Sequence, residues 1–229
     1  MENQVVLAGS VADANRVASF FKSIWQDGED VAPADLILAS LHVGGYCSYI
    51  EQNDAVVAAS FGFRGVLNGE SILHSHVTAS SVPGFGFNLK QHQKLWASTN
   101  EIDAITWTVD PLVRRNAVFN FEKLGAVAIE YLPNFYGSMA DSINLGDESD
   151  RLFIRWPVSL TEAAQPAIGE TKWIELPADI ESLRKSDEAA AKEWRLKIRE
   201  AMLPWFESGA IIRSINAERT AVLIERRVK

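Results

Sequence analysis

The stretch SVPGFGFNLKQHQKLW, Ser81 to Trp96, places Gly84 and Gly86 directly before a segment with helical spacing. A strand that runs into a glycine turn and then a helix points main-chain N–H groups and the positive end of the helix dipole at one spot. Such a spot suits a phosphate, and glycine permits close approach of the ligand and a positive φ. The stretch therefore predicts an anion site in an α/β protein, with a simple tight turn as the alternative.

Two familiar phosphate-binding patterns do not fit this turn. A dinucleotide-binding fingerprint needs a third glycine where Leu89 stands, and a Walker loop needs Gly-Lys followed by Ser or Thr. The net charge of -8 also argues against a broad surface for nucleic acid or anionic lipid. We therefore expect an anion to be bound locally, with no nucleic-acid partner.

The composition is that of a globular protein, with 47% hydrophobic and 23% charged residues among 229. The single cysteine, Cys47, cannot form an internal disulfide and is expected to be a buried residue of a strand. The start, MENQVVLAGSV, lacks the features of a secretion signal, and no apolar stretch is long enough to cross a bilayer. These features predict a cytoplasmic protein without a membrane partner.

Hydrophobic spacing predicts alternating helices and strands. Helices are expected at 10–25, 34–42, from the glycine turn to about 98, at 113–124 and at 179–206, with Pro204 ending or kinking the last. Strands are expected at YCSYIEQ, AVVAASFGF, SILHSHVTA, AITWTVD, VAIEYL and RLFIRWPVSL, and at a closing hairpin of IIRSI and TAVLIE. A meander that continues through crossover helices predicts a central mixed sheet flanked by helices, an α/β (α+β) fold.

The segment from about Leu73 to Gly125 resembles the coenzyme-A-binding core of the GNAT acyltransferase superfamily. The hallmark of that family is Q/R-x-x-G-x-G/A between a strand and a helix, then a strand, an Asn, and a helix ending in Tyr-x-x-x-Gly-Phe. The matching pieces are Ser81-x-x-Gly84-x-Gly86, AITWTVD, Asn116 and Phe121 to Ala126. The resemblance implies acetyl-CoA or another acyl-CoA as co-substrate, without a metal. It implies contacts to coenzyme A from Val77, Ser81, Gly84, Phe85, Gly86, Phe87, Asn88, Asn116 and Phe121.

Three departures from the family pattern stand out. Ser81 replaces the usual Gln or Arg, and Ala126 replaces an aromatic residue after the glycine. Phe121 stands where many members have the tyrosine that protonates the departing thiolate, and phenylalanine has no proton to give. These departures favour the alternative that the protein binds acyl-CoA or a protein partner without turnover.

A narrower resemblance covers most of the chain. The runs LHSHV, ITWTVDPLVRRNAVFNFEKLGA, NFYGSMADSINLGDESDRLFIRW and KEWRLKIRE look like a bacterial clade of GNAT-like proteins with a C-terminal helix and strands. Some members of that clade are associated with N-acyl-amino-acid metabolism, including succinyl transfer. The resemblance implies a GNAT-like domain at 1–160 and a helix-hairpin extension at 161–229 packed on the same domain.

Acyl transfer to an amine needs a base, an oxyanion site and a proton for the thiolate. In the family a main-chain N–H of the central strand, here near Val77 to Ser80, holds the oxyanion. His74 and His76 lie two apart on this strand, so they share one face, and an imidazole suits proton transfer near neutral pH. Hydrogen-bonded scaffold histidines are the plainer interpretation, and a metal site is disfavoured because no third ligand is evident.

Other candidates follow the strand AITWTVD. Arg114 and Arg115 could attract a phosphate or a substrate carboxylate, with a solvated helix start as the alternative. Tyr131 and Tyr136 are the nearest candidates for the proton that Phe121 lacks, with packing as the alternative. We therefore predict transfer of an acetyl or succinyl group from acyl-CoA to a small amine such as an amino acid, in a protein that could form a homodimer.

Overall fold

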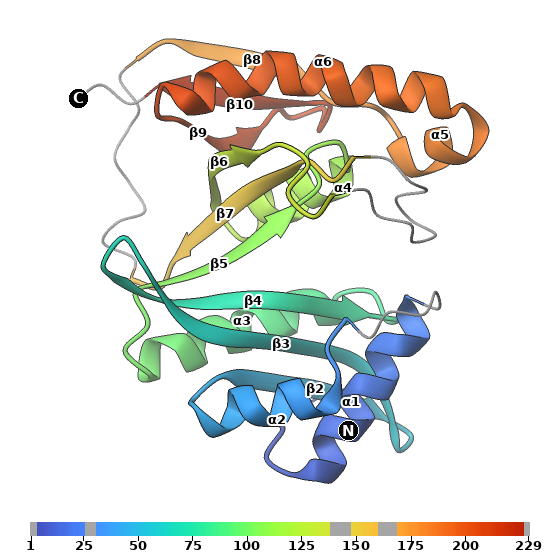
Figure 1. Ribbon diagram of the computed structural model, residues 1–229, viewed down its shortest axis with the longest axis vertical. Coiled ribbons are helices and arrows are strands. Elements are labelled where there is room, and N and C mark those ends of the chain that lie inside the picture. Colours follow the sequence, from blue (N-terminus) through green and yellow to red (C-terminus); the bar gives the residue numbers. More distant parts are fainter. Residues whose placement is uncertain (1–3, 26–30, 138–147, 160–168, 227–229) are drawn as a thin grey trace. The chain divides into compact units, whose positions relative to one another are not determined.

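The computed structural model describes residues 4–25, 31–137, 148–159 and 169–226 (Figure 1). The chain forms two compact units. Unit 1 holds Met1–Thr106 and Pro157–Leu160, and unit 2 holds Trp107–Trp156 and Thr161–Lys229. One division therefore falls inside a strand, after Thr106. The boundary near residue 160 stays a prediction from the sequence.

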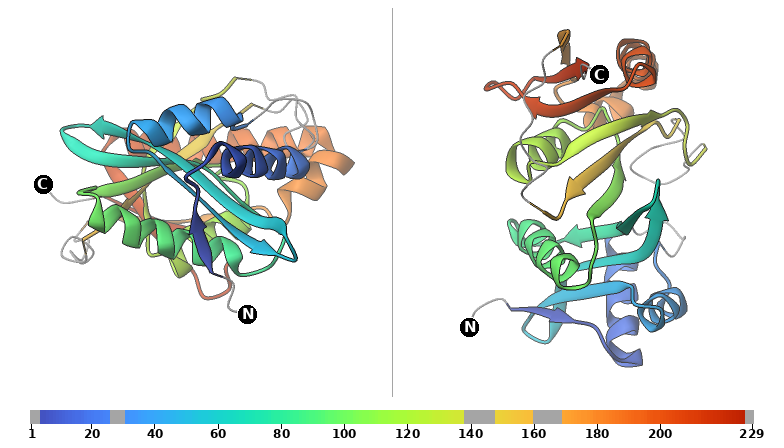
Figure 2. Two further views of the ribbon diagram at one scale, coloured as in Figure 1. Left: turned by 90° about the horizontal axis from the view of Figure 1, so that it is seen from below. Right: turned by 90° about the vertical axis from the view of Figure 1, so that its left-hand side faces the viewer.

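Unit 1 is a sheet with helices on both faces. Its elements are β1 (Val5–Leu7), α1 (Val11–Ile24), α2 (Ala34–His42), β2 (Tyr46–Gln52), β3 (Ala55–Leu67), β4 (Glu70–Ser80), α3 (Phe85–Thr99) and the start of β5 (Ala104–Val109). The strand order is β1-β2-β3-β4-β5, antiparallel up to β4, with β4 and β5 parallel. Helices α1 and α2 lie on one face and α3 lies on the other (Figure 2, left). The predicted meander and crossover helix are confirmed.

Local signals fix the starts and turns of unit 1. The Ser10 side chain accepts a hydrogen bond from the Asp13 N–H while the Asp13 carboxylate accepts from the Ser10 N–H, which forms a capping box at the start of α1. Asn53 and Asp54, both with positive φ, form the two-residue turn between β2 and β3. Cys47 is fully buried, as expected, and burial raises the pKa of its thiol to about 12.

Strand β4 carries a bulge opposite Gly62. Phe63 pairs with His74 and Phe61 pairs with Val77, so Ser75 and His76 together face one residue of β3. A Cβ on Gly62 would lie 2.7 Å from the His74 carbonyl oxygen, which is why this position needs glycine. The bulge turns the side chains of His76 and Val77 toward the face that carries α1 and α2.

Unit 2 contains the rest of β5 and a second group of strands. Its elements are α4 (Arg114–Ala117), the π-helix η1 (Val118–Lys123), β6 (Val127–Leu132), β7 (Arg151–Pro157), β8 (Thr171–Glu175), α5 (Ile180–Ser186), α6 (Glu188–Glu207), β9 (Ala210–Ile215) and β10 (Ala221–Arg226). The order β7-β6-β9-β10-β8 includes the predicted hairpin of β9 and β10, and α6 runs along these strands (Figure 1).

The helical segments predicted in unit 2 are confirmed, but three details differ. The helix expected at 179–206 is broken at Asp187, which ends α5 and whose carboxylate accepts from the Ala190 N–H at the start of α6. Pro204 lies inside α6, which continues to Glu207. The helix expected at 113–124 is an α-helical turn followed by η1. The sequence also gave no indication of β1 or β8.

Ion pairs join the C-terminal part of the chain to residues 107–156 within unit 2. The pairs are Asp110 with Arg184 and Arg195, Arg115 with Glu181, Glu122 with Arg219, and Asp150 with Arg199. The Asp110 side chain is 9% exposed and those of its two arginines are 2% exposed. Burial alone would raise the pKa of Asp110, but the guanidinium groups of Arg195 and Arg184 hold that pKa below its ordinary value. These ion pairs therefore hold the C-terminal extension against residues 107–156 of unit 2.

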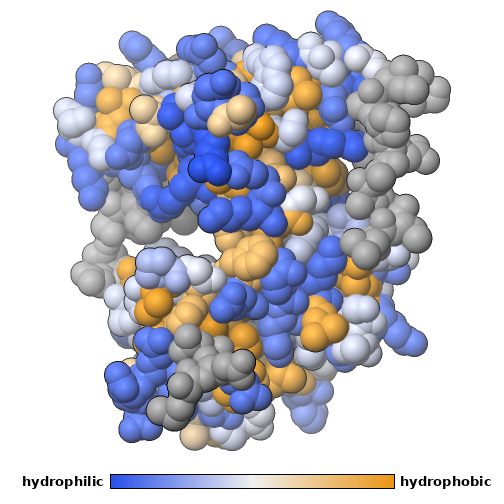
Figure 3. Space-filling model, turned by 180° about the vertical axis from the view of Figure 1, so that it is seen from behind, coloured by the Kyte–Doolittle hydropathy of each residue, from blue (hydrophilic) through white to orange (hydrophobic). Residues whose placement is uncertain are grey.

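Exposed apolar side chains are scattered. On the face drawn in Figure 3, hydrophobic residues form small groups among hydrophilic ones. None of the helices in the described ranges has the length and apolar composition needed to cross a bilayer. Apolar exposure on this face therefore does not single out a docking surface.

Candidate functional site

The glycine turn leads from β4 into α3 in unit 1. Gly84 is the residue before the first turn of α3 and has φ +89°, a conformation that an L side chain rarely adopts. Phe85 is buried beside Ile50 and Leu89 and anchors the helix start. The turn is thus fixed by one left-handed glycine and one apolar anchor.

The main-chain N–H groups of this turn fall into two sets. Those of Phe85, Phe87 and Asn88 donate within the turn, to the carbonyl oxygens of Val82 and Gly84. Within the described ranges, the N–H groups of Gly84 and Gly86 have no hydrogen-bond partner. The expected cluster of donors from Gly84 to Asn88 is therefore reduced to the two glycine amides.

The space beside these two amides is open. A Cβ built on Gly84 or Gly86 would meet no atom within 4 Å. Gly86 has no positive φ and no close neighbour, although glycine in a helix costs about 1 kcal/mol relative to alanine. Nothing in the described protein therefore accounts for Gly86, whereas close approach of a ligand would.

Ser81 does not take over the role of the long polar residue usual in the family. Its hydroxyl donates to the Val57 carbonyl oxygen at 3.0 Å, and its N–H donates to the same oxygen at 2.9 Å. The side chain is thus directed to β3. Phe87 is half-buried and Asn88 is exposed. Any anion at this turn would be held by main-chain groups.

The edge of β4 opens just before the turn. Pairing between β4 and β5 joins Ile72–His74 to Ala104–Thr106 and stops there. Beyond His74, the β5-facing edge of β4 has no strand partner within unit 1 as described. Val77 lies on this open stretch, so the main chain near Val77 can receive a hydrogen-bonding ligand.

His74 and His76 are brought together, as the two-residue spacing predicted. Their ring centroids are 6.4 Å apart, and both rings contact Phe63, at 5.2 and 5.9 Å. Burial first, then the charges of His76 and Lys90, lower the pKa of His74 to about 4, and its Nδ1 lies 3.2 Å from the Thr106 hydroxyl. His74 therefore stays neutral near pH 7 and is a weak base.

His76 is better arranged to accept a proton. Its side chain is exposed, and its Nε2 lies 3.0 Å from the Val31 carbonyl oxygen. A carbonyl oxygen only accepts, so Nε2 carries the hydrogen and Nδ1 of the neutral ring carries the lone pair. Of the two histidines, the geometry favours His76 as the base.

The two arginines predicted to bind substrate both contact the C-terminal extension. Arg114 donates to the Leu176 carbonyl oxygen at 2.7 Å, and Arg115 forms a two-point ion pair with Glu181. A role in binding substrate would require these contacts to be shared or broken. Both arginines therefore have a structural explanation within unit 2.

The other site residues predicted in unit 2 differ in how accessible their polar groups are to a substrate. Phe121 is buried within η1, and the Asn116 carbonyl oxygen accepts from Asn120 on the next turn. The buried Tyr131 hydroxyl donates to Asp150 at 2.5 Å, and burial followed by that carboxylate raises its pKa far above the ordinary value. Tyr136 is 47% exposed and its hydroxyl lies 3.0 Å from that of Thr108. Of the two tyrosines, Tyr136 is the one available to a substrate.

The sequence reasoning missed a buried polar cluster between α3 and the sheet. Lys90 and Gln93 of α3 are buried against Ser60 of β3 and Ser75 of β4. The spacing of Leu89, Gln93 and Ala97 on one helical face was the available signal. His92, on the same helix, is half-buried and its Nδ1 lies 2.8 Å from the Tyr46 hydroxyl.

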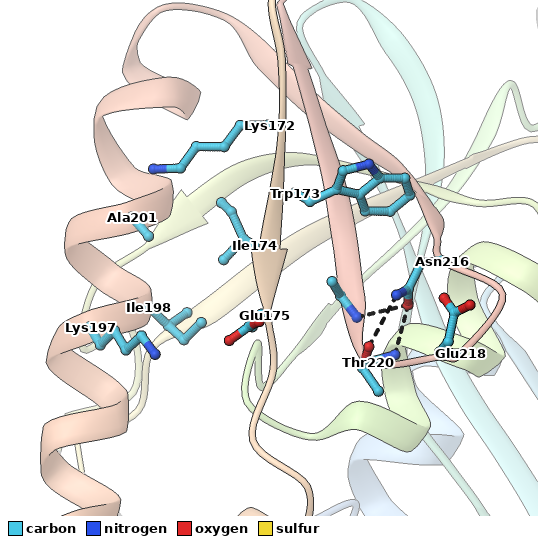
Figure 4. Close-up of a pocket in the computed structure, with 11 residues that line it drawn as sticks. Lys172, Trp173, Ile174, Glu175, Lys197, Ile198, Ala201, Asn216, Glu218 and Thr220 are labelled. Carbon is cyan, nitrogen blue, oxygen red and sulfur yellow. Dashed lines mark hydrogen bonds between the residues drawn. The ribbon is translucent and has the colours of Figure 1, made fainter.

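A pocket of about 730 Å³ lies in unit 2, between β8, α6 and the turn from β9 to β10 (Figure 4). Lys172, Ile174 and Ile198 line it, as does the half-exposed Trp173. It contains none of the residues predicted from the sequence. No group of three His, Cys, Asp or Glu side chains suited to a metal ion occurs among the described residues.

Comparison with known proteins gives matches in structure alone. No family model matches the sequence, and no curated protein matches it. A ribosomal-protein-alanine N-acetyltransferase from Brucella melitensis is similar at a TM-score of 0.54 and 14% identity, over 67% of this chain and 99% of that one. An aminoglycoside 6'-N-acetyltransferase from Enterococcus faecium gives 0.51 and 10%, over 71% and 99%. Naa50 from Arabidopsis thaliana, in complex with the bisubstrate analogue CoA-Ac-MVNAL, gives 0.50 and 18%, over 66% and 97%. The chain therefore has the fold of the GNAT acetyltransferases.

Proposed function

We propose that this protein, which has the GNAT acetyltransferase fold, transfers an acetyl or succinyl group from acyl-CoA to a small amine, with amino acids as the first acceptors to test. The observation that carries the proposal is the pair of N–H groups of Gly84 and Gly86. They lack partners within the described ranges and adjoin open space at the start of α3. Such N–H groups suit a pyrophosphate.

Groups of unit 1 suit the other steps of the reaction. The amine nitrogen attacks the thioester carbonyl carbon, the C–N bond forms and the C–S bond breaks. The main chain of β4 near Val77 would donate to the oxyanion, and His76 Nδ1 would take the proton from the amine. The thiolate leaves as coenzyme A once it has gained a proton, and the tyrosines of unit 2 stay sequence-based candidates for its source.

The names of the similar structures support amines as the acceptor class. One acts on aminoglycosides and one on the alanine of a ribosomal protein, while the third holds an analogue that joins coenzyme A to a peptide. The cytoplasmic location and the homodimer stay predictions from the sequence.

Calorimetric titration with acetyl-CoA and succinyl-CoA, followed by a free-thiol assay with single amino acids, tests the proposal. We expect binding of at least one acyl-CoA and thiol release that depends on the amino acid. The matched variants are His76→Asn, which should stop release while leaving binding intact, and His42→Asn on α2 as a control that changes neither. Absence of binding at millimolar concentration would overturn the proposal.

A second function, acyl-CoA binding without turnover, has its own support. Phe121 has no hydroxyl, and the Tyr131 hydroxyl is held by Asp150. Binding of acyl-CoA without thiol release for any amino acid or short peptide would favour this alternative.

A further inference from the structure

We infer that Lys90 is a positioning residue that holds the β4 bulge, and with it His76, in the geometry that the reaction needs. This inference rests on the proposed function. Lys90 is 4% exposed on α3, and its Nζ donates to the Ser75 hydroxyl at 2.8 Å and to the Gln93 side-chain oxygen at 3.3 Å. Ser75 is the first residue of the bulge and His76 is the second.

The contact continues to both sides of the bulge. The Gln93 amide donates to the Ser60 hydroxyl at 3.3 Å, and Ser60 lies 2.8 Å from the Thr78 hydroxyl. Ser75 and Thr78 are two β4 residues on the α3 side, and they flank His76 and Val77, which face the other way. Helix α3 therefore holds β4 immediately before and immediately after the two residues proposed to act on the substrate.

The bulge is also fixed from β3. Gly62 allows the His74 carbonyl to approach where a Cβ would collide at 2.7 Å. Gly62 permits the bulge, whereas Lys90 bonds to one of its side chains. The space left by Gly62 allows the bulge to form but does not orient His76. The hydrogen bond from Lys90 to Ser75 supplies that orientation.

A lysine at position 90 is energetically unfavourable if it only fills space in the interior. Burial of an ammonium group carries a desolvation penalty, and an apolar side chain of similar length would fill the same volume without it. Burial lowers the pKa of Lys90 to about 7, so the group stays close to the point where it loses its charge. The hydrogen bond to Ser75 explains why position 90 carries a hydrogen-bond donor rather than an apolar side chain.

The same helix carries the proposed anion site. Gly84 and Gly86 stand at the start of α3 and Lys90 stands one turn further on. A helix moves as a rigid element, so a ligand held at its first turn fixes Lys90 relative to β4. Through Lys90, the helix that would hold the coenzyme also holds the β4 bulge that positions His76, the proposed base.

The test compares Lys90→Met with Lys94→Met, a half-buried lysine one turn along the same helix. We expect the Kd for acetyl-CoA of Lys90→Met to stay within about threefold of wild type, while kcat falls about tenfold or more, as loss of one charged hydrogen bond predicts. Hydrogen exchange of residues 73–78 should become about tenfold faster, and that of β2 should not change. Lys94→Met should match wild type in all three.

Two further variants keep the inference falsifiable. Ser75→Ala removes the acceptor without altering α3 and should reproduce the faster exchange if Lys90→Met fails to fold. Lys90→Gln keeps a neutral donor and should restore part of kcat. Unchanged exchange at 73–78 in Lys90→Met and Ser75→Ala would overturn the inference. If wild type binds no acyl-CoA, the proposed function fails, and the exchange data alone then decide whether Lys90 fixes the bulge.

Discussion

The two faces of the unit 1 sheet are closed by different chemistry. On the α1 and α2 face, buried apolar side chains such as Val17, Phe21, Ile37 and Phe61 form one cluster. On the α3 face, apolar contacts near both ends of the helix flank a network of buried hydroxyl, amide and ammonium groups. Apolar packing tolerates exchange of shape at constant volume, whereas hydrogen bonds fix direction. We therefore assign stability mainly to the first face and geometry mainly to the second.

The largest expected effect is on the apolar face. Phe21 is 1% exposed in α1, so Phe21→Ala should lower the free energy of unfolding by about 3–5 kcal/mol through lost burial and a cavity. Denaturant unfolding measures the change. Acetyl-CoA affinity of the fraction that remains folded should be unaltered. A decrease in the free energy of unfolding of less than about 1 kcal/mol would contradict the assignment of stability mainly to the α1 and α2 face.

An intermediate effect is expected from Lys90. Its folded pKa, about 7, lies below the ordinary 10.5, so between these values the unfolded chain binds a proton that the folded chain does not. Stability should therefore rise with pH across that window by up to about 1.4 kcal/mol per pH unit, and the penalty should be complete below pH 7. The other titratable groups on this side are Tyr46, His92 and Lys94. His74 lies on the opposite face of β4, and the charge of Lys90 also lowers its pKa.

Unfolding of wild type and Lys90→Met at several pH values isolates the contribution of Lys90, because the remaining groups are shared. The slope should be smaller in the variant by about one proton. Equal slopes in the two proteins would mean that Lys90 is not desolvated as described.

The smallest effect on stability should accompany a loss of binding. Gly86→Ala places a methyl group in open space and removes a helical glycine, so stability should rise by about 0.5–1 kcal/mol. Affinity for acetyl-CoA should nevertheless fall, because the methyl group stands where the pyrophosphate would approach. Thermal unfolding and calorimetry measure the two effects, with Gly9→Ala as the control. Unaltered affinity would place the ligand elsewhere.

Features with local causes could be predicted from the sequence. The start of α1 and the turn between β2 and β3 depend on neighbours in the chain, namely Ser10 with Asp13 and Asn53 with Asp54, and a helix and two strands were predicted around them. The strand β8 was missed because TKWIE is short and lies directly after a polar loop. The break at Asp187 was missed because the apolar spacing continues across it, although Asp is a common residue at helix starts.

The site was predictable only where the chain supplies it locally. The glycine turn and the shared face of His74 and His76 come from one continuous stretch. The hydrogen bond from Tyr131 to Asp150 and those from Arg114 and Arg115 to the extension join residues 19 to 66 positions apart. Such contacts depend on tertiary packing, which is also why the buried place of Lys90 was not foreseen.

The central claim is that coenzyme A is held by the main chain at the start of α3, and amide NMR during titration with coenzyme A tests it most directly. The account predicts that the Gly84 and Gly86 amide signals shift as the site fills while that of Gly9 stays in place. Binding of coenzyme A that leaves the Gly84 and Gly86 signals unmoved would contradict it.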